Sequence, residues 1–335
     1  MARFLCVLLA LALAGCLGDA PRENPLDPLA DGFRAEGAVT GRVIGAHPPF
    51  PPREGVQVRF VPLGGAGRAE LVTRSDAEGR FALSEVAAGE WAIVAEGEAF
   101  RADADTVTVV VGEAAEVTLE LDALPHVVAQ DLRTVHLARW PPFEELFQLE
   151  VEVTVEDPDR PDDVAGAALV VEELGFRAAL AEVEGAPQGT YAATFDAADL
   201  PGGRVQTLLG RSLRVEVEDE DGESALGPPM SLVRVIEQVP QPLSPISLET
   251  VGTPTPTLRW RLTQLPFAFT HRVDVFVVAG DNVATRLFVE EGIDPFMTAF
   301  TVPDPLPTGE YFWTLWIVDE AGNRSRSREA GFRVP

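Results

Sequence analysis

The sequence predicts an all-β protein made of three tandem antiparallel β-sandwich domains. Apolar residues recur with a period of two in many short runs from residue 38 to the C-terminus. Gly and Pro are frequent, with 29 and 28 residues, and they separate these runs as turn residues do. The chain has 335 residues, of which 46% are hydrophobic, and this is enough to bury a core in each of several domains.

The first sixteen residues read MARFLCVLLALALAGC and predict a secretory signal. Arg3 supplies a short positive start, and residues 4–14 form an unbroken apolar run. A run of this length is too short to span a bilayer and fits the hydrophobic region of a signal peptide. Two alternatives stay open: an ordinary signal with Cys16 near the cleavage site by chance, and an N-terminal helix that is never cut.

Leu13-Ala14-Gly15-Cys16 resembles the lipobox of bacterial lipoproteins. The resemblance implies cleavage between Gly15 and Cys16, followed by lipid attachment to Cys16. Each buried methylene adds about 0.8 kcal/mol of membrane affinity, so several acyl chains would anchor the protein firmly. Leu17 follows the cysteine where an aspartate would favour the inner membrane. We therefore expect removal of residues 1–15 and an outer-membrane lipoprotein of the bacterial cell envelope.

Residues 16–36 are predicted to form an extended tether that carries this lipid. Pro, Asp and Gly recur there and no apolar periodicity survives. Within the tether, Asn24–Pro28 resembles an element often found just after the lipidated cysteine of bacterial surface lipoproteins. The only other cysteine, Cys6, lies in the predicted signal, so the mature chain would have no disulfide.

Residues 37–123 are predicted to form the first sandwich. Alternating runs, separated by Gly, Pro and acidic turns, predict strands at residues 39–43, 56–60, 71–73, 81–83, 91–95, 107–111 and 117–121. Asp76 and Gly79 lie where a hairpin turn needs a side-chain acceptor and a residue with positive φ.

This segment resembles the carboxypeptidase regulatory-like domain, which is a transthyretin-like sandwich. The matching positions are Gly55, Val56, Asp76, Gly79, Phe81, Val86, Gly89 and Trp91. The family usually has a proline near Val86-Ala87 and a tyrosine at the position of Trp91, and this sequence departs from it at both. In carboxypeptidases this domain accompanies the catalytic one, so the resemblance implies a module that is not itself an enzyme.

Residues 124–240 are predicted to form an immunoglobulin-like sandwich. Its first part, which contains Trp140-Pro141-Pro142, is a less regular passage with no clear strand pattern. Strands are then predicted at residues 149–155, 164–171, 191–195, 213–217 and 233–235.

Two acidic clusters, residues 156–163 and 218–223, lie at the ends of these strands. Calcium takes six to eight oxygen ligands, and cadherin-like surface domains supply them from such loops. One hypothesis is therefore a calcium site on Asp157, Asp159, Asp219 and Asp221. The alternative is a pair of solvated turns, because Asp and Gly are common turn residues and charge runs usually face solvent.

Residues 241–335 resemble a fibronectin type III domain. The resemblance rests on Trp260, on Tyr311 and on an Asp-x-x-Gly-Asn pattern at residues 319–323 before the last strand. Strands are predicted at residues 258–262, 273–277 and 311–317, with His271 outside the apolar rhythm of its run.

The strand at residues 311–317 has apolar residues on both faces. A strand of an open sheet normally has a polar outer face, but here that face carries Phe312 and Trp316. These two aromatics are candidates for stacking on a sugar ring or on a partner protein. The alternative is that they pack on a neighbouring domain or under a loop.

The formal net charge is −27, from 53 acidic and 26 basic residues, and every basic residue counted is arginine. Such acidity opposes binding to nucleic acid and adhesion of the folded body to an anionic membrane. The membrane contact is therefore expected through the N-terminal lipid alone. The absence of lysine excludes Schiff-base and P-loop lysine chemistry.

No catalytic constellation is recognisable in the sequence. It has no G-x-S-x-G, no paired metal ligands and no phosphate loop, and its four histidines are far apart. We expect a non-catalytic surface or periplasmic scaffold or adhesion protein, with no cofactor unless the calcium hypothesis holds and with an unidentified protein or glycan partner. The alternative is a carbohydrate-binding lipoprotein that uses Trp91, Trp140 and Trp316.

Overall fold

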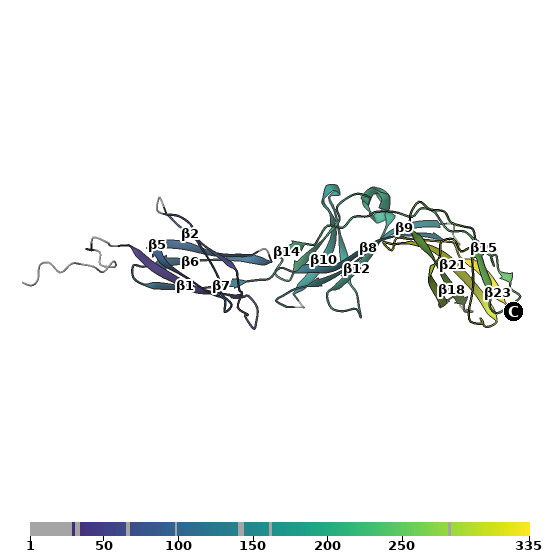
Figure 1. The fold of residues 1–335 in the computed structure, drawn as a ribbon, viewed down its shortest axis with the longest axis horizontal. Coiled ribbons are helices and arrows are strands. Elements are labelled where there is room, and N and C mark those ends of the chain that lie inside the picture. Colours follow the sequence, from purple (N-terminus) through teal and green to yellow (C-terminus); the bar gives the residue numbers. More distant parts are fainter. Residues whose placement is uncertain are drawn as a thin grey trace, which may run out of the picture. The chain divides into compact units, whose positions relative to one another are not determined.

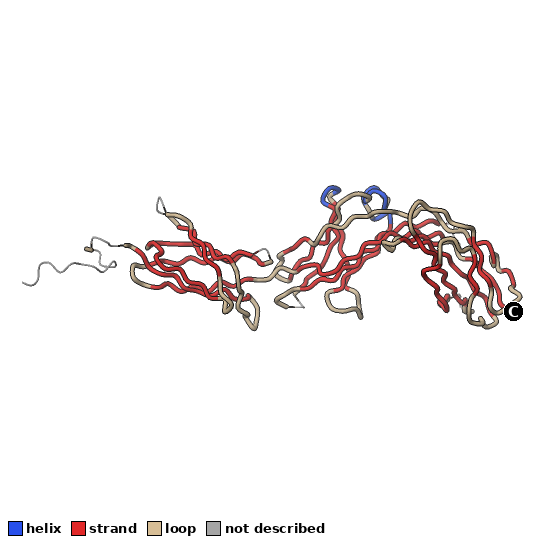
Figure 2. The backbone as a smooth tube through the Cα atoms, in the orientation of Figure 1, coloured by secondary structure: helices blue, strands red, loops and turns tan. Residues whose placement is uncertain are grey.

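The computed structural model describes residues 29–30, 34–64, 68–97, 99–139, 144–160, 163–280 and 283–335. In this part of the chain nearly all regular structure is β-strand, and helix is confined to short 3₁₀ turns between β10 and β13 (Figure 2). The predicted all-β fold class is confirmed. None of the described helical turns has the length and hydropathy to cross a membrane. Gly15 and Cys16 lie outside the described residues.

The chain divides into two compact units. The N-terminal unit holds residues up to Leu124 together with Pro158–Arg160, and the C-terminal unit holds Pro125–Asp157 and Pro161–Pro335. The C-terminal unit contains two sandwiches with separate cores, which we call the second and third sandwiches.

The N-terminal unit is one sandwich of two sheets, ordered β4-β1-β7 and β3-β2-β5-β6. Its strands are β1 (Glu36–Gly45), β2 (Gln57–Pro62), β3 (Leu71–Arg74), β4 (Arg80–Ala87), β5 (Gly89–Gly97), β6 (Phe100–Val109) and β7 (Ala114–Leu121). Neighbouring strands are antiparallel except β1 and β7, which pair in parallel.

The core of this unit consists of the apolar residues that alternate in the sequence. Phe60, Ile93 and Leu119 are fully buried between the sheets. Gly41 permits the packing: a Cβ there would lie 2.3 Å from the carbonyl oxygen of Val117 and 2.5 Å from the ring of Phe81. Only glycine therefore lets β1 pass this close to its neighbours.

The second sandwich is formed by seven strands of one connected sheet path, β14-β13-β10-β11-β12-β9-β8. The strands are β8 (His126–Arg139), β9 (Glu144–Glu156), β10 (Val164–Val171), β11 (Phe176–Glu182), β12 (Thr190–Asp196), β13 (Arg214–Asp219) and β14 (Ser224–Leu226). β11 passes between the two layers, because its first part pairs with β10 and its end pairs with β12. Leu149, Leu169 and Val215 are fully buried between these layers.

The third sandwich contains β15 (Pro242–Ser244), β16 (Glu249–Thr250), β17 (Thr257–Trp260), β18 (Phe269–Val278), β19 (Ala284–Ile293), β20 (Ala299–Thr301), β21 (Gly309–Asp319), β22 (Arg324–Arg326) and β23 (Ala330–Val334). Its core holds Trp260 and Trp313. Tyr311 is also buried, and its Oη donates a hydrogen bond to the carbonyl of Pro307 at 2.7 Å. These features fit a sandwich of the immunoglobulin or fibronectin III type.

β8 joins the sheets of the second and third sandwiches. β8 pairs with β9 along its length, and its residues Val135–Leu137 also pair in parallel with β22. One sheet therefore continues from β9 through β8, β22 and β21 to β18 and β19, and Figure 1 labels β8, β9, β21 and β18 of this path. The prediction of an irregular passage before residue 140 was wrong here. Three successive residues of β8, Thr134, Val135 and His136, are buried, so buried and exposed residues do not alternate there.

Two smaller predictions were also wrong. Residues 233–235 form no strand, and Val233 is 68% exposed. This segment instead runs extended beside β8, where the Arg234 carbonyl accepts a hydrogen bond from Thr134 Oγ1 at 3.1 Å. His271 is not outside the core rhythm, because it lies in β18 and is fully buried.

Candidate functional site

The inner face of β21 is buried as the sequence predicts, whereas its outer face is less exposed than expected. The inner-face residues are buried in the third sandwich: Tyr311, Trp313, Leu315 and Ile317. On the outer face Phe312 and Trp316 are only half-buried. They lie four positions apart, which on a strand is roughly 13 Å, so they form two separate surfaces.

The ring of Trp316 is surrounded by arginines of its own sheet. The guanidinium carbon of Arg272 lies 5.6 Å from the ring centroid, and those of Arg324 and Arg326 each lie 5.9 Å away. Trp316 Nε1 also donates a hydrogen bond to Asp274 Oδ2 at 2.8 Å. These are cation–π distances, so the ring already has partners within the sheet and does not form an open platform for a sugar.

Phe312 lines a groove of about 680 Å³ on the third sandwich. Its ring stacks on that of Phe276, with centroids 4.7 Å apart and planes 10° from parallel. Polar side chains lie in the same groove: Ser247, Glu310, Arg328 and Glu329. The volume falls within the range of small-ligand sites, and an aromatic surface beside carboxylates is an arrangement that suits a sugar ring.

The other aromatics named from the sequence add nothing to this groove. Trp91 is 1% exposed in the core of the N-terminal unit, where its Nε1 donates to the carbonyl of Ala87 at 2.8 Å. Trp140 lies outside the described residues.

The acidic residues of the calcium hypothesis fall into different surroundings. Asp157 and Asp219 are buried at the end of the second sandwich, 7% and 2% exposed, whereas Asp221 is exposed. Asp159 belongs to the N-terminal unit, where it pairs with Arg53 and accepts a hydrogen bond from the backbone N–H of Ala123. Of the four, only Asp157 and Asp219 therefore share one buried end of a sandwich.

Asp163 belongs to the predicted acidic cluster at residues 156–163 but not to the four aspartates of the calcium hypothesis, and it is 2% exposed directly before β10. The signal in the sequence that could have indicated its burial is its position between an acidic run and an apolar run. A carboxylate directly before the first residue of a buried strand is drawn into the end of the sandwich with that strand.

A serine and a histidine lie together in the C-terminal unit, but they are inaccessible. His136 Nδ1 is 3.2 Å from both Ser325 Oγ and the carbonyl oxygen of Ile236, and its Nε2 is 3.7 Å from a carboxylate oxygen of Glu145. Ser325 is fully buried and His136 is 1% exposed, so no substrate reaches the hydroxyl. Burial lowers the pKa of the His136 imidazole, which is the ordinary behaviour of a core histidine.

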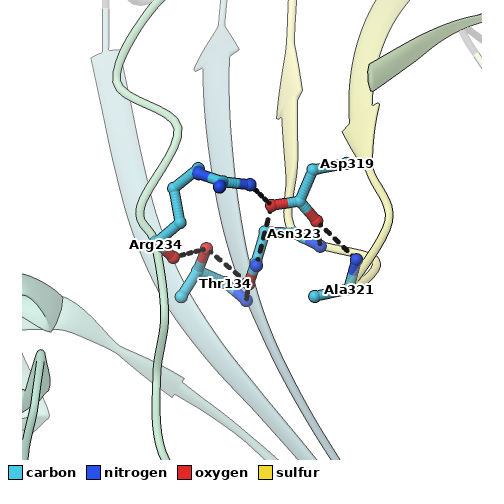
Figure 3. A network of polar contacts seen from close by, with 5 residues as sticks. All are labelled: Thr134, Arg234, Asp319, Ala321 and Asn323. Atoms are coloured by element: carbon cyan, nitrogen blue, oxygen red, sulfur yellow. Dashed lines mark hydrogen bonds and ion pairs between the residues drawn. The ribbon is translucent and has the colours of Figure 1, made fainter. Parts of the chain in front are cut away.

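A buried polar cluster ties β8 to the turn that follows β21 (Figure 3). Asn323 Oδ1 accepts hydrogen bonds from the backbone N–H of Thr134 at 2.9 Å and from Thr134 Oγ1 at 3.0 Å. Asn323 Nδ2 donates to Asp319 Oδ2 at 3.1 Å, and Arg234 Nη1 donates to the same oxygen at 2.6 Å. The other oxygen, Asp319 Oδ1, accepts from the backbone N–H groups of Ala321 and Asn323.

This cluster joins three segments that are distant in the sequence. Thr134 is 1% exposed on β8, Asn323 is 1% exposed in the turn after β21, and Arg234 lies on the segment that connects the two sandwiches. The sequence indicated the Asp-x-x-Gly-Asn turn as a fibronectin III feature. It gave no signal that the asparagine also bonds a strand of the preceding sandwich, because that contact spans 189 positions.

No protein-family profile matches this chain, and no curated protein matches it either. Among solved structures, a DUF3823 family protein from Parabacteroides merdae is 14% identical over 58% of this chain and 96% of that chain, with a TM-score of 0.26. BcpA, the major pilin subunit of Bacillus cereus, is 10% identical over 86% of this chain and 91% of its own, with a TM-score of 0.30. The FN1–FN3 domains of chicken CNTN1 are 8% identical over 84% of this chain and 95% of that chain, with a TM-score of 0.31. At these identities and at TM-scores of 0.31 and below, none of these likenesses assigns a fold or a function to this chain.

Proposed function

We propose that this chain is a non-catalytic scaffold or adhesion protein of the bacterial cell envelope, held at the outer membrane by lipid on Cys16. The observation that carries the proposal is the junction between the second and third sandwiches. A scaffold has to hold its domains in a fixed relative orientation. Here one sheet contains strands of both sandwiches, and one buried polar cluster bonds residues of both.

Further contacts across the same junction support this function. Arg324, on β22, pairs with Glu150 of β9 at 2.6 Å. His136 of β8 stacks on Phe147 within the second sandwich, and its Nδ1 reaches across the junction to lie 3.2 Å from Ser325 Oγ in β22. Such mutually bonded groups favour one relative arrangement of the two sandwiches.

The lipid anchor is tested by changing each cysteine separately. Cys16→Ser removes the only site at which the lipobox resemblance places lipid, so the protein should leave the membrane fraction or remain unprocessed. Cys6→Ser changes a cysteine of the predicted signal and should leave membrane attachment intact. The measurement is detergent partitioning together with the mass of the mature N-terminus. Membrane attachment of Cys16→Ser equal to that of the unchanged protein would contradict the lipoprotein assignment.

A second candidate function, carbohydrate binding, is favoured by the groove around Phe312. In this reading the phenyl ring stacks on an apolar sugar face, and the groove's carboxylates accept hydrogen bonds from hydroxyl groups. The test is a glycan array with the full chain. Phe312→Ala should abolish any signal, whereas Phe296→Ala changes an 82% exposed aromatic outside the groove and should retain it. A signal that survives Phe312→Ala would assign glycan binding elsewhere.

A further inference from the structure

Few residues form the contact between β8 and β22. Residues 135–137 of β8 pair there with residues 324–326 of β22, in parallel, whereas β8 pairs with β9 along nearly all of its length. A parallel pairing of three residues supplies few backbone hydrogen bonds. Because proteins open locally where the fewest contacts hold them, the second and third sandwiches separate most readily between these two strands.

His136 lies in the middle of this contact, opposite Ser325. Its Nδ1 lies 3.2 Å from Ser325 Oγ and 3.2 Å from the carbonyl oxygen of Ile236, which belongs to the segment between β14 and β15 that connects the two sandwiches. The ring stacks on Phe147 of β9, with centroids 4.0 Å apart. His136 is 1% exposed, so its ring reaches water only when β22 or the connecting segment moves away from β8.

These partners fix which ring nitrogen of His136 carries the proton. A carbonyl oxygen only accepts hydrogen bonds, so Nδ1 donates to Ile236 and Nε2 is the basic nitrogen of the neutral ring. Nε2 is buried and has no hydrogen-bond partner among the described residues. A carboxylate oxygen of Glu145 lies 3.7 Å from it, beyond hydrogen-bond distance. The closed contact therefore accommodates the neutral ring.

Two carboxylates face the ring from the elements packed against it. Glu145 lies on β9 with 53% of its side chain exposed, and Glu237 is exposed on the connecting segment. Both carboxylates favour a protonated imidazole, but burial opposes it more strongly and lowers the pKa of His136. Proton uptake is therefore easier once the ring reaches water.

The cations near the contact are directed elsewhere. On β22, Arg324 and Arg326 alternate with Ser325, so their side chains project from the other face of the strand. Arg234 of the connecting segment bonds Asp319. Among the described residues of this contact, His136 is then the side chain of the type that ordinarily changes its charge in mildly acidic solution.

We propose that the junction of the second and third sandwiches is a pH-sensitive switch: in mildly acidic solution His136 takes up a proton, and β22 separates from β8 while both sandwiches stay folded. Water hydrates the exposed imidazolium, whereas the closed contact offers its Nε2 no bonded acceptor. The closed contact is stable above the ordinary histidine pKa of about 6.5 and loses stability as the pH falls through that value. The inference rests on the proposed scaffold function and adds the condition that releases the fixed arrangement.

The test is hydrogen exchange of the full chain in detergent at about pH 7.5 and about pH 5.5, corrected for the pH dependence of exchange in unfolded peptides. The reporter is the Thr134 amide, whose hydrogen bond to Asn323 Oδ1 crosses the junction. An exposed imidazole is about nine-tenths protonated at the lower pH, so the opening constant at Thr134 should rise by up to about tenfold. Thr134 should also exchange faster than Leu169 in the core of the second sandwich. His136→Phe keeps an aromatic ring against Phe147 but removes the titrating nitrogen, so it should abolish the rise.

The matched control is His271→Phe, which makes the same substitution at a buried histidine whose ring bonds the Trp316 carbonyl within the third sandwich. It should leave the pH response of the Thr134 amide intact. If His136→Phe does not fold, an NMR titration of the His136 ring in the unchanged chain carries the test, and a pKa at or above the ordinary value of about 6.5 contradicts the switch.

The switch is also contradicted if the opening constant at Thr134 changes by less than about twofold between the two pH values, against the tenfold limit set by linkage. Exchange of Thr134 as slow as that of Leu169 at both pH values has the same meaning, because the contact would then open only when the second sandwich unfolds. A Thr134 amide without protection at the higher pH is a different result. It would contradict the scaffold function itself, since the junction would not be closed at all.

Discussion

Replacing Asn323 with alanine should uncouple the second and third sandwiches. The change deletes the acceptor that bonds the Thr134 N–H and Oγ1, and the donor that bonds Asp319 Oδ2. Thr134 is 1% exposed, so its N–H has no access to water once the acceptor is gone.

The expected loss of unfolding free energy follows from the groups left unpaired. A buried donor without an acceptor costs ~1–3 kcal/mol, and a lost hydrogen bond to a charged carboxylate costs ~1.5–3 kcal/mol. We therefore expect a loss of about 2.5–6 kcal/mol, which is a large part of the 5–15 kcal/mol that stabilises an ordinary domain. The C-terminal unit should then unfold in two transitions instead of one, because the two cores no longer depend on each other.

Urea unfolding followed by circular dichroism measures the loss, and hydrogen exchange at the Thr134 amide locates it. Glu320→Ala is the control, since it changes an exposed residue of the same turn and should alter stability by no more than ~0.5 kcal/mol. A loss below ~1 kcal/mol for Asn323→Ala, or unchanged protection of the Thr134 amide, would refute the reasoning.

Two further predictions concern stability. Burial lowers the pKa of the His136 and His271 imidazoles, so the unfolded chain takes up these protons more readily than the folded chain. The free energy of unfolding should therefore be full above about pH 6.5 and fall as the pH drops below it. Urea unfolding at neutral and mildly acidic pH should show that His271→Phe reduces this pH dependence. Gly41→Ala should destabilise the N-terminal unit by ~1–3 kcal/mol in the same assay, because the new methyl group would lie 2.5 Å from the Phe81 ring. As the control, Gly166→Ala places its methyl group where no atom lies within 4 Å, so it should be nearly neutral. Equal losses of stability for the two variants would contradict this packing at Gly41.

The sequence predicts those strands that keep one face toward one core. β5 and β10 are examples, because Trp91, Ile93 and Ala95 alternate and residues 164–171 form a single apolar run. It fails at β8, where three successive residues, 134–136, are buried, and at residues 233–235, where the Thr134 side chain bonds the Arg234 carbonyl. Local periodicity carries no information about either arrangement.

The candidate site residues likewise include some features that the sequence shows and others that only the fold creates. The turn pattern at residues 319–323 is visible in the sequence, but its bond to Thr134 is not, because only the fold brings them together. Phe312 and Trp316 are equivalent in the sequence, whereas the structure places Phe312 in a groove and Trp316 among three arginines. The aspartates of the two acidic clusters look alike in the sequence, whereas the structure buries Asp157, Asp163 and Asp219 and leaves Asp221 exposed.

We propose that the second and third sandwiches form one body that serves as a scaffold. The most direct measurement is the distance distribution between two spin labels, on Asp199→Cys of the second sandwich and Phe296→Cys of the third, in a chain whose own cysteines are serine. Both positions are exposed, so labelling should not disturb either core. The account predicts a single narrow distribution that broadens in Asn323→Ala. A broad distribution in the chain that retains Asn323 would contradict it.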